Sequence, residues 1–424
     1  MNDRGNNLIN IVATEGQELI APYGLPNPAA KTVASGANDF AFRLSAALAE
    51  EVGDENFVCS PYSVWMPLAA LINAMDARAR HALLAALSAS GVSSADINTA
   101  ASRMLYDLTN ASSKQFADDP LLEGMESCYD PLKIANAIFV DKSVTLKKDF
   151  AQTFMDFYRG NAINVDFTSK DAVDAVNKWA SENTDGLITD IVSDFPRDAV
   201  ATIANAIYFS DRWDREFDPK ETAENVFHAP EGDVPAFYML REMWRQTYYE
   251  DEKIQALPLQ FSTGGGLYIL LPKNGNATGL LSKMTKTYFD EIQKKSVQAK
   301  GKLLLPRFSI ESSLMSLSVV LGALGVPLFD GSIVSLSDGL IEEDFPVWFS
   351  DAIQKAVIRV DEKGTTAAAV TVIALCGAAM MPDPTETFEM ICDKPFVFIL
   401  YGNTCDGGSQ VLFTGIVNRP GESG

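Results

Sequence analysis

Hydrophobic positions follow helical spacing near the start of the chain. The apolar residues of Asp39–Glu51 have the spacing of an amphipathic helix. The segment Asn56–Ala74 is largely apolar and predicts a second helix that begins after Ser60–Pro61. The serine can cap this helix, and the proline suits its first turn. Two further helices are predicted at Ala77–Leu87 and Asp96–Asn110. The first quarter of the chain is therefore expected to be mostly helical.

From residue 132 onward the pattern favours strands, with helical patterns at Val144–Phe157 and around Val173–Trp179. The predicted strands are Leu132–Asp141, Ala162–Phe167, one within Ala199–Phe217, Glu221–Phe227, Ala236–Leu240, Gln246–Tyr249, Gln255–Pro258, Gly266–Pro272, Lys302–Phe308 and a closing pair after Cys392. No internal repeat or linker divides the chain. We therefore expect a single domain of the α+β class.

One segment fits neither pattern. From Gly364 through Pro382 no residue is charged, although a fifth of the whole chain is. A run of about 19 uncharged residues is long enough to cross a membrane, but this one has few large apolar residues and charged residues close by on both sides. A buried strand would explain the β-branched Val370–Ile373 but not the alanines before it, which are poor strand formers. We expect no membrane span here.

The letters E-K-G-T-T-A-A-A, from Glu362 to Ala369, resemble the hinge of the serpins, protease inhibitors whose exposed reactive loop inserts into their own sheet. Small uncharged side chains suit that task, because alternate residues of an inserted strand face the core. The resemblance implies a fold with three β-sheets, about eight or nine helices and a reactive loop at about residues 362–387. The hinge residues it assigns are Glu362, Gly364, Thr365, Thr366, Ala367, Ala368 and Ala369.

Further matches to the family concern the region where its main sheet opens. Ser60 and Ser63 stand in an S-P-x-S pattern, and Asn205 lies in T-I-A-N-A-I-Y-F. A buried amide in a strand needs hydrogen-bond partners, and in serpins this Asn helps to tie the strands together. Gln354 stands where the family usually carries His. Because Gln donates and accepts hydrogen bonds without titrating, we expect the bonds to survive and any pH sensitivity from that His to be lost.

The resemblance also sets the predicted domain limits. Residues 39–420 form the serpin domain, residues 1–38 an N-terminal extension of low order, and residues 421–424 a short tail. Met1–Asn38 is polar and has no apolar run like a secretion signal, so either the protein stays inside the cell or a signal is missing from this chain. From the family's function we expect a secreted or extracellular protein. The absent signal and the absent heparin site indicate a prokaryotic-type member of the family.

The predicted reactive bond joins Ala378 and Ala379, about sixteen residues beyond Glu362, within a wider window of Leu375–Met381. Small side chains on both sides suit the shallow apolar pocket of elastase-like or subtilisin-like serine proteases. They offer no cation to a trypsin-like pocket. The expected function is irreversible suicide-substrate inhibition, with the protease as partner and a monomeric inhibitor.

Composition argues against several other classes of function. A net charge of −22 argues against nucleic acid, and the lack of a basic helix argues against a heparin-type cofactor. The scattered cysteines show no metal-binding spacing, so we expect no metal and no cofactor. An enzyme is the first rival, but the sequence has only two histidines and no G-x-S-x-G, Walker or H-E-x-x-H motif. The second rival is a non-inhibitory serpin that acts as a carrier, chaperone or storage protein.

Overall fold

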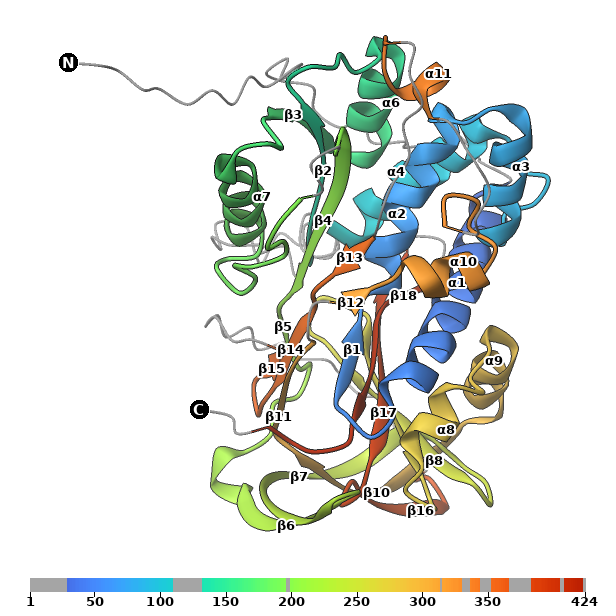
Figure 1. Ribbon diagram of the computed structural model, residues 1–424. Coiled ribbons are helices and arrows are strands. Elements are labelled where there is room, and N and C mark those ends of the chain that lie inside the picture. The colour runs from blue at the N-terminus through green and yellow to red at the C-terminus, as the bar shows by residue number, and fades with distance from the viewer. Residues whose placement is uncertain are drawn as a thin grey trace, which may run out of the picture.

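The computed structural model describes residues 29–109, 132–195, 199–312, 315–329, 336–343, 352–365, 383–404 and 408–421. The helices in these ranges are α1 (Ala30–Val52), α2 (Pro61–Leu71), η1 (Ile72–Ala74), α3 (Ala77–Ala86), α4 (Ser94–Thr109), α6 (Lys148–Tyr158), α7 (Lys170–Asn183), η2 (Pro219–Glu221), α8 (Ala277–Leu281), α9 (Lys286–Lys295), α10 (Ser318–Ala323) and α11 (Ser337–Leu340). Figure 1 shows most of them gathered beside the sheets, with α7 on the opposite side.

The first nine strands in these ranges are β1 (Phe57–Cys59), β2 (Leu132–Asp141), β3 (Gly160–Val165), β4 (Ala201–Phe209), β5 (Asp211–Arg212), β6 (Ala223–Ala229), β7 (Gly232–Glu250), β8 (Ile254–Gln260) and β9 (Gly266–Pro272). The later strands are β10 (Val297–Pro306), β11 (Phe308–Glu311), β12 (Met315–Ser316), β13 (Ile353–Gln354), β14 (Val357–Val360), β15 (Gly364–Thr365), β16 (Glu386–Ile391), β17 (Phe396–Asn403) and β18 (Ser409–Val417).

Three sheets organise the fold. The main sheet has two parts, β3-β2-β4 and β11-β14-β15-β5, which are continuous along the chain because β4 leads into β5 after Ser210. A second sheet has the order β1-β18-β17-β9-β8, and a third contains β6, β7, β10 and β16. The long strand β7 belongs to both, since its far end at Tyr249 pairs with β8. The predicted α+β fold with three sheets is confirmed.

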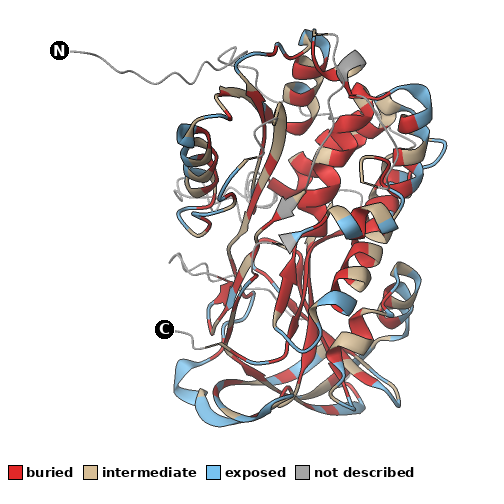
Figure 2. Ribbon diagram, in the orientation of Figure 1, coloured by how far each residue is buried: buried red, intermediate tan, exposed pale blue. Residues whose placement is uncertain are grey.

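The main sheet separates two apolar layers. Its inner face packs on α2, α4 and α6, and this large core extends to the second sheet. Its outer face at β2 and β4 is covered by α7, where Trp179 meets Phe139 edge-on with ring centroids 5.9 Å apart. Figure 1 shows α7 on one side of β2 and β4 with α2 and α4 on the other. In Figure 2 the buried residues follow the strands and the helix faces turned toward them.

The last strands of the chain lie inside the second sheet. β17 pairs with β9 on one side and β18 on the other, and β18 also pairs with β1 from the start of the domain. Ser60 begins α2 as predicted, because its hydroxyl accepts a hydrogen bond from the backbone N–H of Ser63 at 3.4 Å. Helix α2 contacts β4 of the main sheet and β18 of the second sheet.

Some predicted boundaries differ from the structure. Helix α1 begins at Ala30, so residues 30–38 belong to the folded domain rather than to an extension of low order. The reason is that Val33 and Ala37 continue the buried face that Phe40 begins. The predicted strands Ala236–Leu240 and Gln246–Tyr249 are parts of the single strand β7, which β10 pairs along most of its length.

Candidate functional site: the hinge and the opening of the main sheet

The hinge begins as a strand inside the main sheet. Gly364 and Thr365 form β15, where Thr365 pairs with Val360 on one side and with Asp211 on the other. Thr365 is 1% exposed, and its hydroxyl accepts a hydrogen bond from the backbone N–H of Asp211 at 3.2 Å. The side chain thus faces inward, as the alternation of an inserted strand requires.

Gly364 allows this strand to form. Its φ is +151°, and a Cβ placed on it would collide with the backbone carbonyl oxygen of Asp211. Side chains of L-residues do not tolerate such contact, so the backbones of β15 and β5 can approach only through a glycine. The hinge glycine therefore has a steric role in this chain.

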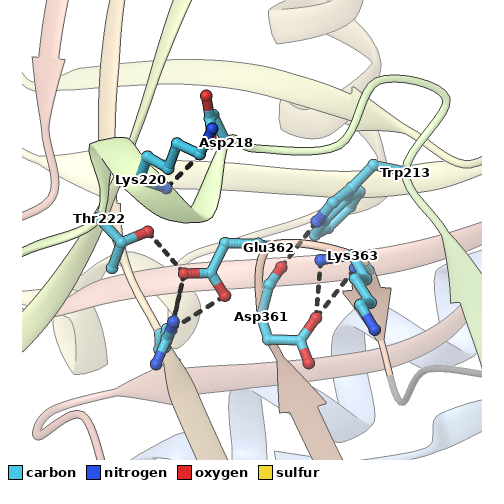
Figure 3. Close-up of polar contacts among 9 residues, drawn as sticks. Trp213, Asp218, Lys220, Thr222, Asp361, Glu362 and Lys363 are labelled. Carbon is cyan, nitrogen blue, oxygen red and sulfur yellow. Dashed lines mark hydrogen bonds and ion pairs between the residues drawn. The ribbon is translucent and has the colours of Figure 1, made fainter.

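Glu362 is a buried carboxylate locked by two partners. Arg307, at the end of β10, donates from Nε to Oε1 at 2.9 Å and to Oε2 at 3.0 Å, and from Nη2 to Oε1 at 2.5 Å. Thr222 donates its hydroxyl to Oε1 at 2.5 Å (Figure 3). Burial acts to raise the pKa of the Glu362 carboxyl, but the bonds from Arg307 and Thr222 outweigh it and hold the pKa below its usual value. The charge therefore stays on the carboxylate.

The backbone around Glu362 is held by the segment 213–217. Trp213 donates its indole N–H to the carbonyl of Asp361 at 2.9 Å (Figure 3). Its backbone N–H donates to the carbonyl of Lys363, also at 2.9 Å. Phe217 donates its backbone N–H to the carbonyl of Glu362, also at 2.9 Å. The turn from β14 to β15 is thus clamped at three successive carbonyls, and opening it requires breaking all three bonds.

The sheet-opening cluster brings together three of the predicted residues. The Gln354 side chain accepts from the backbone N–H of Ser60 at 3.0 Å and donates to the Ser60 carbonyl at 2.8 Å and the Ser63 hydroxyl at 2.6 Å. The Ser60 hydroxyl donates to the carbonyl of Leu412 at 2.7 Å. These bonds tie α2 to β13 and β18 without any group that titrates near neutral pH.

Asn205 lies nearby but bonds elsewhere. It donates to the side-chain oxygen of Asn136 at 2.6 Å, its direct neighbour across β2 and β4. Asn136 in turn donates to the carbonyl of Tyr158 at 2.8 Å. The side-chain oxygen of Asn205 is buried and accepts no hydrogen bond. The predicted amide therefore holds the β2–β4 half of the sheet, and its oxygen remains unsatisfied.

Asn205 and Gln354 line one cavity of about 70 Å³ between the main sheet, α2 and α10. Its other lining residues are Ser63, Val64, Pro67, Leu68, Leu71, Ile203, Leu317, Leu321, Leu328, Phe329 and Ala352. In the described ranges no strand pairing joins β4 directly to β14, so the cavity lies beneath a gap in the sheet. Thr366, Ala367, Ala368, Ala369, Ala378 and Ala379 lie outside the described residues.

Sequence reasoning missed the partners that hold the hinge: Arg307, Thr222 and Trp213. Arg307 and Trp213 stand in the motifs L-P-R-F and Trp213-x-x-x-Phe217, but neither pattern indicates which carboxylate or carbonyl they will meet. Their partners lie 55 to 150 residues away along the chain. Only the fold brings them together.

A family model described as "Serpin (serine protease inhibitor)" matches residues 35–420 of the chain. The chain belongs to the serpin family. An uncharacterized serpin-like protein of Thermococcus kodakarensis is 31% identical to this serpin over 298 residues, which cover 68% of this chain and 66% of that protein. Alpha-1-antiproteinase of Rattus norvegicus is 26% identical over 416 residues, covering 97% and 95% of the two chains.

Solved structures show the same fold. The thermophilic serpin tengpin in its native state superposes on this serpin with a TM-score of 0.78 at 22% identity, covering 97% of this chain and 99% of that one. Human thyroxine-binding globulin complexed with thyroxine gives a TM-score of 0.76 at 21% identity, covering 93% of this chain and 100% of that one. At these identities the likeness concerns architecture alone.

Two other kinds of site are absent from the described part of this serpin. No helix there is both long and apolar enough to cross a membrane. No group of three or more His, Cys, Asp or Glu side chains in the same ranges is arranged to hold a metal ion.

Proposed function

We propose that this serpin traps serine proteases irreversibly by offering its loop as a substrate and inserting the cut loop into its main sheet. The observation that carries the proposal is the position of β15. Strand β15 already pairs with β5 through Gly364 and Thr365 and with β14 through Thr365, so the first step of a new central strand is in place. A loop freed at its far end can extend this strand between β14 and β4.

The register of β15 predicts where the inserted residues would lie. Six residues beyond Thr365, position 371 falls opposite Gln354 on one side and Asn205 on the other. Position 373 falls opposite Ala352 and Ile203. All four neighbours line the cavity. The hydroxyl of Thr371 would then donate to the unsatisfied oxygen of Asn205, and Ile373 would fill apolar space.

The state with the loop inserted would be lower in free energy, and a kinetic barrier rather than equilibrium would keep the uncut protein from reaching it. The clamp at 213–217 and the Glu362–Arg307 pair hold the turn that must stay fixed while the loop beyond it moves. Beyond Thr365 the hinge supplies no large or charged side chain that would slow entry, because Thr366–Ala369 are all small. Such a hinge favours an inhibitor over a carrier, chaperone or storage protein.

The reactive bond we propose is Ala378–Ala379. The protease serine would attack the carbonyl carbon of Ala378, the bond to the nitrogen of Ala379 would break with a proton passing to that nitrogen, and Ala378 would remain on the protease as an ester. Insertion before hydrolysis would carry the protease away and distort its site. The chain contributes no catalytic group of its own.

The partners we propose are elastase-like and subtilisin-like proteases, because an Ala on each side of the bond suits a small apolar pocket. We propose action outside the producing cell as a monomer, without metal, cofactor, nucleic acid or heparin. The net charge of −22 supports the last two exclusions.

The test is to mix the protein with pancreatic elastase and with subtilisin and to look for a complex that survives SDS. Mass spectrometry of the C-terminal fragment, separated by denaturation, then locates the cut. We expect a covalent complex, a cut within Leu375–Met381 and a sharp rise in the melting temperature of the cleaved protein. A protein that is cut without complex formation, and melts as before, would be a non-inhibitory serpin.

A further inference from the structure

An open pocket lies where the end of β6 meets α8 and the turn before β17. Its volume is about 550 Å³, which is in the range of pockets that hold small molecules. Two of its lining residues, Ala277 and Pro395, are buried and apolar. The others include charged and polar side chains from several segments that are far apart in the sequence. We call this cavity the α8 pocket.

Two cationic side chains line the α8 pocket from neighbouring segments. His228 donates its backbone N–H to the carbonyl of Asp393 at 2.7 Å, which places the end of β6 beside Lys394. In the described chain the ion-pair partner of Lys394 is Asp393, whose carboxylate lies 3.7 Å from Nζ, beyond hydrogen-bond distance. Nδ1 of His228 lies 2.7 Å from the Asp233 carboxylate, and this contact raises the pKa of His228. Protonation leaves an N–H at Nε2 that can donate to a ligand.

Two asparagines add uncharged donors to the α8 pocket. The side-chain oxygen of Asn274 accepts from the backbone N–H of Asn276 at 3.1 Å, and that of Asn276 accepts from the backbone N–H of Gly279 at 2.7 Å. The backbone thus occupies both oxygens, and neither NH₂ group has an acceptor within the described ranges. Together with the two cations, these amides form a set of donors that suits a ligand with several acceptor oxygens.

Carboxylates near the α8 pocket limit how much negative charge a ligand can carry. Asp54 lines the pocket and is exposed, while Asp233 and Asp393 partly offset the charges of His228 and Lys394. A polyanion would meet these three groups in addition to the net charge of −22. A molecule with one carboxylate and several hydroxyls would place its charge on the cations and its hydroxyl oxygens on the amides.

We propose that the α8 pocket binds a small hydroxy acid with a single negative charge, with its carboxylate between His228 and Lys394 and its hydroxyls on Asn274 and Asn276. Such a ligand would join β6, α8 and the turn that connects β16 to β17. Binding would therefore raise the melting temperature of the folded protein. None of these residues belongs to the hinge or the reactive loop, so the site does not depend on protease trapping.

Titration calorimetry with D-gluconate as the probe tests this site. Gluconate should bind saturably, with one molecule per chain. Sorbitol carries the hydroxyls without the charge, and acetate carries the charge without the hydroxyls, so each should bind at least about tenfold more weakly. Absence of saturable gluconate binding would overturn the proposal, and so would sorbitol or acetate that binds as tightly as gluconate.

Single substitutions locate the binding in the α8 pocket. Lys394→Met should weaken gluconate binding about five- to tenfold, because it removes an ammonium group that is partly exposed. Asp54→Asn should strengthen binding, because it removes a like charge from the rim. Lys302→Met is the matched control, since Lys302 lies on β10 and pairs with Glu242 outside the pocket. Parent-like binding by Lys394→Met, or an equal loss in Lys302→Met, would refute the assignment.

The role of His228 predicts a pH dependence. Gluconate stays ionised from about pH 6 to about pH 8.5, whereas His228 loses its proton over this range, with Asp233, Asp393 and Lys394 as the charged groups that face it. The parent should therefore bind gluconate more tightly at about pH 6, and His228→Gln should abolish the difference. A pH dependence that persists in His228→Gln would contradict the place given to the carboxylate.

Discussion

Trp213 donates its indole N–H to the backbone carbonyl of Asp361 at 2.9 Å, across 148 residues of sequence. The Trp213 ring is itself fixed by stacking on Phe261, with centroids 4.8 Å apart and planes 7° from parallel. A rigid, buried donor thus marks the point where β14 ends and the hinge begins. The first residues of the hinge, from Glu362 to Thr365, therefore form a preorganised turn rather than a free end.

Breaking the Glu362–Arg307 pair should destabilise the uncut protein. Glu362→Gln or Arg307→Met leaves the other partner without its counter-ion. Because the Glu362 side chain is buried and that of Arg307 is about a third exposed, we expect a loss of about 1–3 kcal/mol in the free energy of unfolding. The midpoint of urea unfolding measures the loss. Lys302→Met is the control, since Lys302 and Glu242 form an exposed pair at 3.6 Å. A shift no larger than the control's would mean that the pair is not a lock.

The same carboxylate should make the hinge acid-sensitive. The pKa of Glu362 is lower in the folded protein than its usual value of 4.5, so its stabilising contribution is complete above that value and is lost as pH falls through the folded pKa. Other carboxylates titrate as well, including Asp166, whose pKa its Lys142 partner lowers to about 2. The informative quantity is the difference in melting temperature between the parent and Glu362→Gln, which should shrink below about pH 4.5. A difference constant down to pH 3 would contradict this.

Gly364→Ala should damage the start of the central strand. Alanine there combines an unfavourable φ with a Cβ that collides with the Asp211 carbonyl, so we expect a loss of about 2–4 kcal/mol and weakened pairing of β15. Gly91→Ala separates the two effects, because Gly91 has φ +80° but open space around it, and should cost about 1–2 kcal/mol. Equal losses in the two variants would show that the close contact is unimportant.

Thr365→Arg should convert an inhibitor into a substrate. Thr365 is 1% exposed and faces the core, so arginine at this position brings a charge into the sheet as it opens and slows insertion. Deacylation would then outrun trapping, and the ratio of covalent complex to cleaved product should fall at least about tenfold. Ala369→Glu should act in the same way. If Thr365→Arg inhibits as well as the parent, insertion is not the mechanism.

Gln354→His should introduce pH dependence that the parent lacks. A buried imidazole among Ser60 and Ser63 would resist protonation, so its folded pKa would lie below 6.5 and stability would fall as pH drops from about 7 to 5. The melting temperature of the parent should change less over that range. Parallel curves for the two proteins would show that this cluster does not sense pH.

Local patterns carried much of the prediction. The strand Leu132–Asp141 has the predicted limits, and Ser60, Ser63 and Gln354 meet as the family resemblance implied. The sequence does indicate the early start of α1, because Val33 and Ala37 precede Phe40 at helical spacing and lie on the same face of the helix. The predicted limits were wrong for β7. Pairing with several neighbouring strands, rather than its own alternation of apolar and polar residues, decides where this strand begins and ends.

The pairings of polar side chains could not be predicted in this way. Asn205 bonds to Asn136 rather than to Gln354 because the register of β2 against β4 places the two amides opposite each other. Arg307 reaches Glu362 only because β10 ends beside the turn after β14. Such contacts depend on how strands are ordered in space, which spacing along one sequence does not specify.

The strands β17 and β18 are the last parts of the domain to be synthesised, yet β18 pairs with β1 near its beginning, as in the contact of Phe57 with Ile416. The side chain of Asn38 likewise bonds to the backbone of Ser409 and Val411. The second sheet cannot close until the ribosome has released almost the entire chain. Nascent serpin therefore spends most of its synthesis with β1 lacking its strand partner, and a message truncated by its last few dozen codons yields a chain that cannot complete its core.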